Sequence, residues 1–143
     1  MNSFFDVIEE LSKSRKIRDG QLQDAIYEIL ETASRTIKTQ RVNAWLFTDD
    51  FSEIYCIGNF DSIQNKMVSQ SNLPRIAMPL YFKLFETEKI INTPDAFNNK
   101  QTAELLEIYL KPNDIQSLMD IPIRIEGEIM GVVCFENTKS TRV

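Results

Sequence analysis

The chain has 143 residues, of which 43% are hydrophobic and 26% charged, a profile typical of one globular domain with a single core. Its 16 basic and 21 acidic residues give a net charge of −5, which argues against nucleic-acid binding because that affinity comes mostly from neutralising phosphates. The chain opens without a secretory signal, and no window has the roughly 18 apolar residues of a membrane span. We therefore expect a cytoplasmic protein without a membrane partner.

Histidine is absent from the sequence, which removes the Ser-His-Asp and Cys-His catalytic pairs and any His-ligated haem or zinc. The two cysteines, Cys56 and Cys134, form no CxxC motif and are expected to be buried or semi-buried thiols. These features predict a protein that is not an enzyme and has no catalytic residue, metal site or cofactor.

The first half of the chain is predicted to contain two helices and then two strands. A short helix over 3–13 is followed by a longer one over 19–38, in which apolar residues recur at helical spacing. Strands over 41–48 and 53–60 form a hairpin, and the first is apolar on both faces, as in the middle of a covered sheet. Residues 61–73 show no pattern and are expected to form a long loop.

The second half is predicted to contain two further helices and three strands. A helix over 80–87 is followed by a short strand over 89–92 and a polar loop over 93–101. A second helix over 102–110 is ended by Lys111-Pro112. The last two strands, over 117–125 and 128–136, are joined by a turn at Glu126-Gly127. The whole order predicts an α+β fold, in which a largely antiparallel sheet carries helices on both sides.

Four segments of the chain are similar to segments of a known protein family, and they occur in the same order. They read Arg41-Val42-Asn43-Ala44-Trp45-Leu46-Phe47, Ile90-Ile91-Asn92-Thr93-Pro94-Asp95-Ala96, Ser117-Leu118-Met119-Asp120-Ile121-Pro122-Ile123 and Gly131-Val132-Val133-Cys134-Phe135-Glu136. Over roughly 20–137 the chain resembles a GAF domain of the kind found in bacterial histidine kinases and diguanylate cyclases. The resemblance implies a central sheet of five or six strands with the two hairpins meeting at its centre.

The resemblance also has consequences for domain organisation. Residues 1–143 are expected to form a single GAF-like domain with N-terminal helices within 3–38. The exit helix of the family, which leads to an output domain, is expected to be missing after Glu136. A second copy of the chain is therefore expected to cover the apolar stripe of the second helix, which consists of Leu22, Ile26, Ile29, Ala33 and Ile37.

The family places its ligand pocket on the other side of the sheet. The residues that the resemblance puts there are Tyr81, Phe82, Asp95, Phe97, Thr102, Tyr109, Leu118, Asp120 and Cys134. Aromatic walls with a few polar anchors suit a small planar or amphipathic ligand. Each residue also has a structural interpretation: Asp95 and Thr102 as helix or loop caps, the aromatic residues as core, and Asp120 as a partner of backbone amides or of Arg124.

Known ligand classes of the family fit the sequence poorly. Bilin attachment uses a Cys next to a His, which this chain lacks. The cyclic-nucleotide signature is incomplete, because Asn65-Lys66-Met67 lacks the following Phe-Asp-Glu. Haem would have only Cys134 as a placed axial ligand. The ligand is therefore expected to be an unknown small molecule.

Three functions remain open at this stage. The first is a non-catalytic sensory module that relays a signal through paired helices to an absent kinase or cyclase domain. The second is a ligand-free structural dimerisation module whose bulky side chains fill their own pocket. A GAF-fold methionine sulfoxide reductase is disfavoured. The family topology that the resemblance implies puts Cys56 and Cys134 two strand spacings apart, about 9 to 10 Å, beyond the roughly 7 Å limit for a disulfide.

Overall fold

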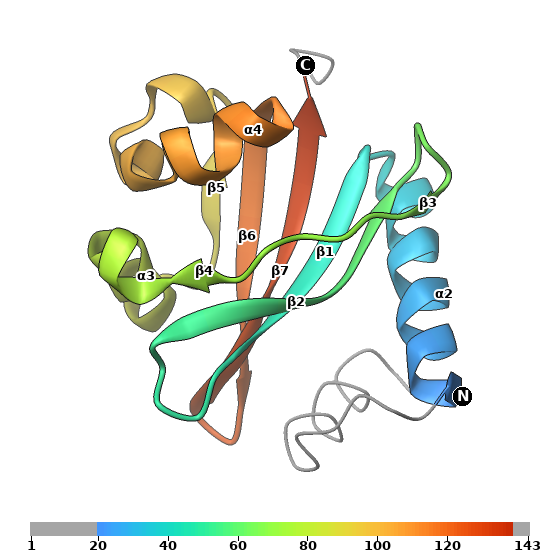
Figure 1. Cartoon of the computed structure of the whole chain (residues 1–143), viewed down its shortest axis with the longest axis horizontal. Helices are drawn as coiled ribbons and strands as arrows, with labels where there is room; N and C mark the ends of the chain where they lie inside the picture. The colour runs from blue at the N-terminus through green and yellow to red at the C-terminus, as the bar shows by residue number, and fades with distance from the viewer. Residues whose placement is uncertain (1–19, 139–143) are drawn as a thin grey trace.

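An antiparallel sheet with the strand order β3-β2-β1-β7-β6-β5 runs through the molecule, and β4 pairs with the opposite end of β2 from β3 (Figure 1). The structure is a computed structural model that describes the backbone of residues 20–138 and the side chains of residues 24–138. The strands are β1 (Arg41–Phe47), β2 (Glu53–Asp61), β3 (Lys66–Met67), β4 (Leu73–Pro74), β5 (Ile91–Thr93), β6 (Ile115–Ile125) and β7 (Glu128–Thr138). The predicted helix over 3–13 lies outside the described residues.

Two hairpins meet at the centre of the sheet, as predicted, because β1 of the first pairs with β7 of the second. The turn between β6 and β7 places Glu126 and Gly127 at φ values of 53° and 83°. Positive φ at both central residues is the conformation that closes a tight two-residue hairpin, and glycine adopts it without strain.

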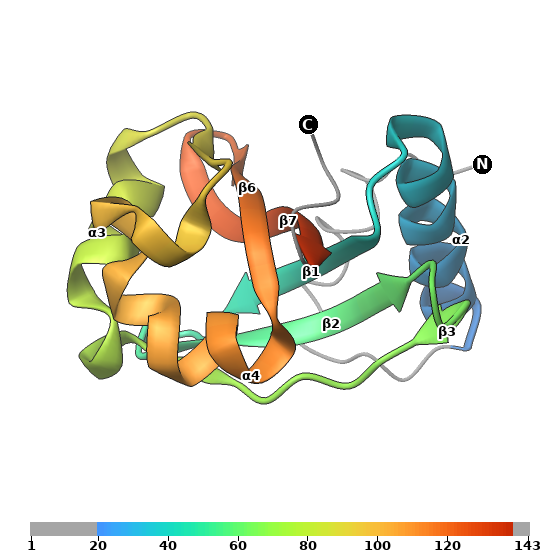
Figure 2. The same ribbon diagram turned by 90° about the horizontal axis from the view of Figure 1, so that it is seen from above.

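Helices cover both faces of the sheet, and each face has its own core (Figure 2). α2 (Gly20–Ile37) packs on one face at β1 and β2, through buried Ile26 and Leu30. The other face carries η1 (Arg75–Ala77), α3 (Pro79–Thr87), η2 (Ala96–Asn98), η3 (Lys100–Leu105), η4 (Leu106–Leu110) and α4 (Lys111–Asn113). Among the described residues, no helix combines the length and apolar character required to cross a membrane.

The helix predicted over 102–110 is wrong in its type and in its end. Residues 100–105 form a 3-10 helix, residues 106–110 a π-helical turn, and the helix α4 then continues through Pro112. Proline has no N–H to donate to the carbonyl four residues earlier, and its ring clashes with that carbonyl in a regular α-helix. The wider π turn before Pro112 accommodates this.

A β-bulge in β2 sets which side chains face each core. Ala44 pairs with Gly58, but Trp45 pairs with Cys56, so Ile57 is the extra residue. Because the bulge shifts the alternation by one position, Cys56 before it and Asn59 after it share a face. Gly58 fits under α2, since a Cβ there would lie 2.8 Å from Ile26 Cγ2 and 2.9 Å from Leu30 Cδ1.

The apolar stripe of α2 packs largely against its own sheet, which corrects the expectation that the stripe has no partner within the chain. Ile26 is 0% exposed, so its side chain is not available to a second copy. Ile29 and Ala33 are half-buried beside it, whereas Ile37 is 41% exposed. The side chain of Leu22 lies outside the described residues.

Candidate functional site

Buried and mostly polar side chains form two cross-strand rows on the sheet face that α3, η3 and η4 cover. The strand registers align Asp120, Cys134, Asn43 and Asn59 in the first row, and Leu118, Glu136, Arg41 and Asp61 in the second. Every member is at most 5% exposed. Successive residues of a strand point to opposite faces, so residues two apart on β1, β6 and β7 bring the rows side by side. A buried sheet face of this polarity is unusual, because burying a polar group without a partner costs free energy.

Asp120 is the polar centre at one end of the first row. The Tyr81 hydroxyl donates a 2.6 Å hydrogen bond to its Oδ2, whereas Oδ1 accepts no hydrogen bond from any described residue. The Cys134 thiol lies close enough to lower the pKa of Asp120, but thiols are weak donors and this one does not reach hydrogen-bond geometry. Burial dominates and raises the pKa of Asp120 to about 7.

Glu136 is the polar centre of the second row and was not among the residues predicted for the site. Its carboxylate accepts a 2.6 Å hydrogen bond from the Tyr109 hydroxyl and a 3.0 Å hydrogen bond from Asn43 Nδ2. Arg41 Nε lies 3.3 Å from its Oε1. Burial raises the pKa of Glu136, although Arg41, Tyr109 and Asn43 all act to lower it. Glu136 is the last residue of the last predicted strand. A polar residue at the end of a strand is normally exposed, so nothing in the sequence indicated that Glu136 is buried.

Unpaired donors lie at the other end of the rows. Arg41 Nε, Arg41 Nη2 and Asn59 Nδ2 are buried and make no hydrogen bond within the described part of the chain. The segment between β3 and β4 passes over this end: the Val68 amide donates to Asn59 O at 2.8 Å, and Gln70 Nε2 donates to Asn113 Oδ1 at 3.0 Å. The charge of Arg41 is balanced by Glu136, but most of its hydrogen-bonding capacity is unused.

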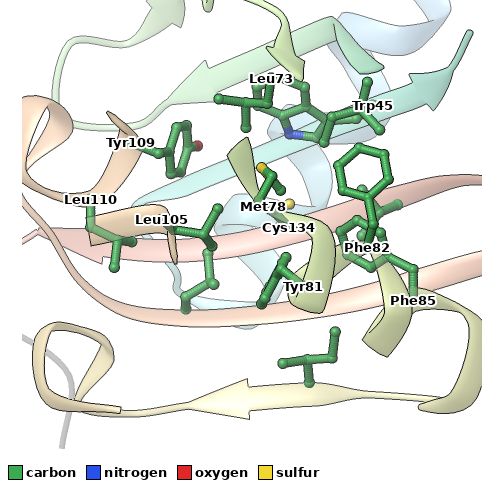
Figure 3. Close-up of a cluster of buried hydrophobic side chains, with 14 of the residues drawn as sticks. Trp45, Leu73, Met78, Tyr81, Phe82, Phe85, Leu105, Tyr109, Leu110 and Cys134 are labelled. Carbon is green, nitrogen blue, oxygen red and sulfur yellow. The ribbon is translucent and has the colours of Figure 1, made fainter. Parts of the chain in front are cut away.

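A small cavity lies between α3, η3, η4 and the sheet. Its volume is about 20 Å³, and its polar walls are Asp120, Cys134 and Glu136. Figure 3 shows the apolar side chains of this core, among which Trp45, Met78, Tyr81, Phe85, Leu105 and Tyr109 line the cavity. A volume of this size holds about one water molecule.

Five of the predicted pocket residues line this cavity: Tyr81, Tyr109, Leu118, Asp120 and Cys134. The structure thus brings together residues from α3, η4, β6 and β7. The sequence missed Trp45 and Met78 as walls, because a Trp in an apolar strand and a Met before a helix are typical of any core.

The other four predicted residues have structural roles. Phe82 is buried against Phe47, with ring centroids 5.7 Å apart. Thr102 donates to Ala96 O at 2.6 Å and so fixes the start of η3. Asp95 is exposed and accepts from the side chain of Asn98, and Phe97 packs at the edge of the core.

Two further interpretations from the sequence are settled by the geometry. Arg124 donates to Phe85 O at 2.6 Å, so the suggested pairing of Asp120 with Arg124 is wrong. Cys56 and Cys134 are both free thiols. Burial raises the pKa of Cys56 to about 12 and raises that of Cys134 as well, so both remain protonated near neutral pH.

The family model of the GAF domain matches residues 21–142, so the chain belongs to the GAF domain family, a sensory and regulatory fold of signalling proteins. Among curated proteins, none matches this chain.

Solved structures of other GAF domains are similar in fold. One, from a phosphoenolpyruvate-protein phosphotransferase of Coxiella burnetii, is 17% identical with a TM-score of 0.63, over 94% of this chain and 77% of that one. The blue-light absorbing PixJ GAF domain of Thermosynechococcus elongatus is 16% identical with a TM-score of 0.67, over 90% of this chain and 77% of that one. A GAF domain/HD domain protein of Geobacter sulfurreducens is 12% identical with a TM-score of 0.56, over 96% and 77%. At these identities the likeness concerns the fold alone.

Proposed function

We propose that this GAF domain is a non-catalytic sensory module that binds a small molecule on the polar sheet face and relays its binding to an output domain of the kinase or cyclase type. The observation that carries the proposal is that Asp120 Oδ1, a buried acceptor at the wall of a cavity, has no partner within the described part of the chain. Native proteins pair nearly all such groups, so an unpaired one beside a cavity favours a ligand that supplies the donor.

The state of the thiols supports a binding role over cysteine chemistry. A nucleophilic cysteine acts as the thiolate, whereas burial raises the pKa of both Cys56 and Cys134. Within the described residues, no cluster of His, Cys, Asp or Glu has the arrangement of a metal site. The second candidate, a ligand-free structural module, is favoured by the small volume of the cavity, about 20 Å³.

A thermal-shift screen of the purified protein separates the two candidates. A ligand present at a hundredfold excess over its Kd stabilises the native state by about 2.7 kcal/mol. The sensory proposal expects at least one hit among amino acids, amines, organic acids and nucleotides, and loss of that hit in Asp120→Asn. The matched control is Asp95→Asn, since Asp95 is exposed and lies outside the cavity. A folded protein that responds to no compound would favour the structural module.

A further inference from the structure

The cavity beside Asp120 combines a very small volume, an unpaired acceptor and aromatic walls. We infer that it binds an ammonium group, either as the free ammonium ion or as the head of a small primary amine. This inference rests on the proposed ligand-binding function of the same site and names the chemistry of the ligand.

The size of the cavity limits the group that enters it. A volume of about 20 Å³ accepts one water-sized group. An ammonium group has one heavy atom and a size close to that of water. A carboxylate, a phosphate or a ring needs several times this space, so the cavity excludes such groups in this conformation.

The hydrogen-bonding needs of the walls specify a donor. Asp120 Oδ1 has no hydrogen-bond partner among residues 24–138, and the Tyr81 hydroxyl already donates to Oδ2. Glu136, the other carboxylate at the wall, has both oxygens occupied by Tyr109 and Asn43. The unmet requirement is therefore an N–H or O–H directed at Oδ1, and an ammonium group carries several N–H donors.

The charges around the cavity favour a cation over a neutral donor. Glu136 and Asp120 are carboxylates on adjacent strands, and each is at least 97% buried, with exposed fractions of 0% and 3%. The positive charge of Arg41 lies beside Glu136, and among the described ion pairs none involves Asp120. A buried carboxylate without a counter-charge is costly, and a cation in contact with it reduces that cost.

Aromatic rings complete the site. Trp45, Tyr81, Phe85 and Tyr109 all line the cavity, and Trp45 and Tyr109 pack edge to face with centroids 6.0 Å apart. Aromatic faces attract cations, most strongly where water is excluded. A small anion would meet two carboxylates and the same rings, which repel it.

The first test is a thermal-shift titration at about pH 8 with ammonium and methylammonium chloride, against potassium chloride of equal ionic strength as the baseline. We expect a saturable rise in Tm with ammonium or methylammonium and no rise above baseline with tetramethylammonium, which is too large and has no N–H. A response to ammonium alone identifies the free ion, and a response that extends to longer amines identifies an amine head. Equal responses to potassium and ammonium would overturn the inference.

Two variants test whether the ammonium response arises at Asp120. Asp120→Asn, checked for folding by circular dichroism, should abolish the ammonium response, whereas Asp95→Asn should retain it. If Asp120→Asn does not fold, the wild-type protein is titrated with ¹⁵N-ammonium by NMR, where a bound ion gives a proton signal protected from exchange with water. The absence of such a signal at saturating ammonium would contradict the inference.

The pH dependence provides a separate readout. The titratable groups around Asp120 are Tyr81 on α3, Tyr109 on η4, and Cys134 and Glu136 on β7, with Arg41 on β1 paired to Glu136. Because the pKa of Asp120 is about 7, ammonium affinity should fall about tenfold between about pH 8 and about pH 6 as the carboxylate is protonated. An affinity that is constant with pH would count against Asp120 as the partner.

Different results would contradict the ammonium inference and the proposed sensory function. A neutral or anionic ligand that stabilises the wild type but not Asp120→Asn, together with no response to amines, would overturn the ammonium assignment and leave the sensory role intact. No response to any compound by a folded protein would remove both.

Discussion

Tyr81 and Asp120 are 39 positions apart in the sequence, and the tyrosine hydroxyl donates a 2.6 Å hydrogen bond to Asp120 Oδ2. This hydrogen bond links α3 directly to β6 inside the core. Because the pKa of Asp120 is about 7, the acceptor changes its charge near neutral pH. A hydrogen bond to an ionised acceptor is stronger than one to a neutral acceptor, so the contact between α3 and β6 should strengthen when Asp120 loses its proton.

Tyr81→Phe tests the strength of this link. Removing the hydroxyl leaves a buried carboxyl without a donor, so we expect a loss of about 1 to 3 kcal/mol in unfolding free energy. Urea denaturation measures it. Tyr27→Phe is the control, because the Tyr27 hydroxyl makes no hydrogen bond to a described residue, and it should change stability much less. Equal losses in the two variants would contradict the assigned role.

Stability should fall as the pH rises through neutrality. Burial raises the pKa of Asp120 from 3.8 to about 7, so the folded protein holds a proton that the unfolded chain releases. The resulting stabilisation is complete below about pH 4 and is lost as the pH rises through about 7, a change of about 2 to 3 kcal/mol between pH 5 and pH 8. Asp120→Asn should flatten this dependence, and an unchanged slope in that variant would assign the effect elsewhere.

Glu136→Gln should destabilise the protein strongly. The variant leaves the charge of Arg41, whose side chain is 5% exposed, without its counter-charge, and breaking such a buried pair costs about 3 to 5 kcal/mol. The double variant with Arg41→Met should recover much of the loss. The exposed pair of Glu31 and Arg35 offers a control, since Glu31→Gln should cost less than about 1 kcal/mol. Additive losses in the double variant would show that Arg41 and Glu136 are not coupled.

The homodimer expected from the sequence is best tested at Ile37. This side chain is 41% exposed, so Ile37→Glu should leave the fold intact and yield a monomer on a sizing column with light scattering. Ile26→Glu is the contrast: Ile26 is 0% exposed, and a buried carboxylate there should unfold the domain. A folded Ile37→Glu variant that stays dimeric would place the interface elsewhere.

Long periodic segments were predictable from the sequence. The two hairpins and the helices α2 and α3 lie close to their predicted bounds, because their hydrophobic spacing repeats over several residues. β3 and β4 were missed, since strands of two residues are too short to show alternation. The sheet therefore has seven strands where five or six were predicted.

The candidate site was only partly predictable. In β6 the apolar residues Met119 and Ile121 alternate with Asp120, a pattern that ordinarily buries the apolar side chains and exposes the polar one. Instead Asp120 is buried and both apolar neighbours are half-buried, because the helices over that face cover it more fully. Glu136 and Asn43 are recognisable as a network only when β1 and β7 are paired, which sequence spacing does not reveal.

The extra residue Ile57 makes the chemistry of the sheet face depend on chain length at one point. Deletion of that residue would remove the bulge and rotate one arm of β2 by half a turn relative to the other. Either Asn59 and Asp61 would then point towards α2, or Ile54 and Cys56 would leave the other core. Substitutions along β2 would change one side chain of the site at a time, whereas the loss of a single codon here would reverse the facing of every side chain on one arm of the strand.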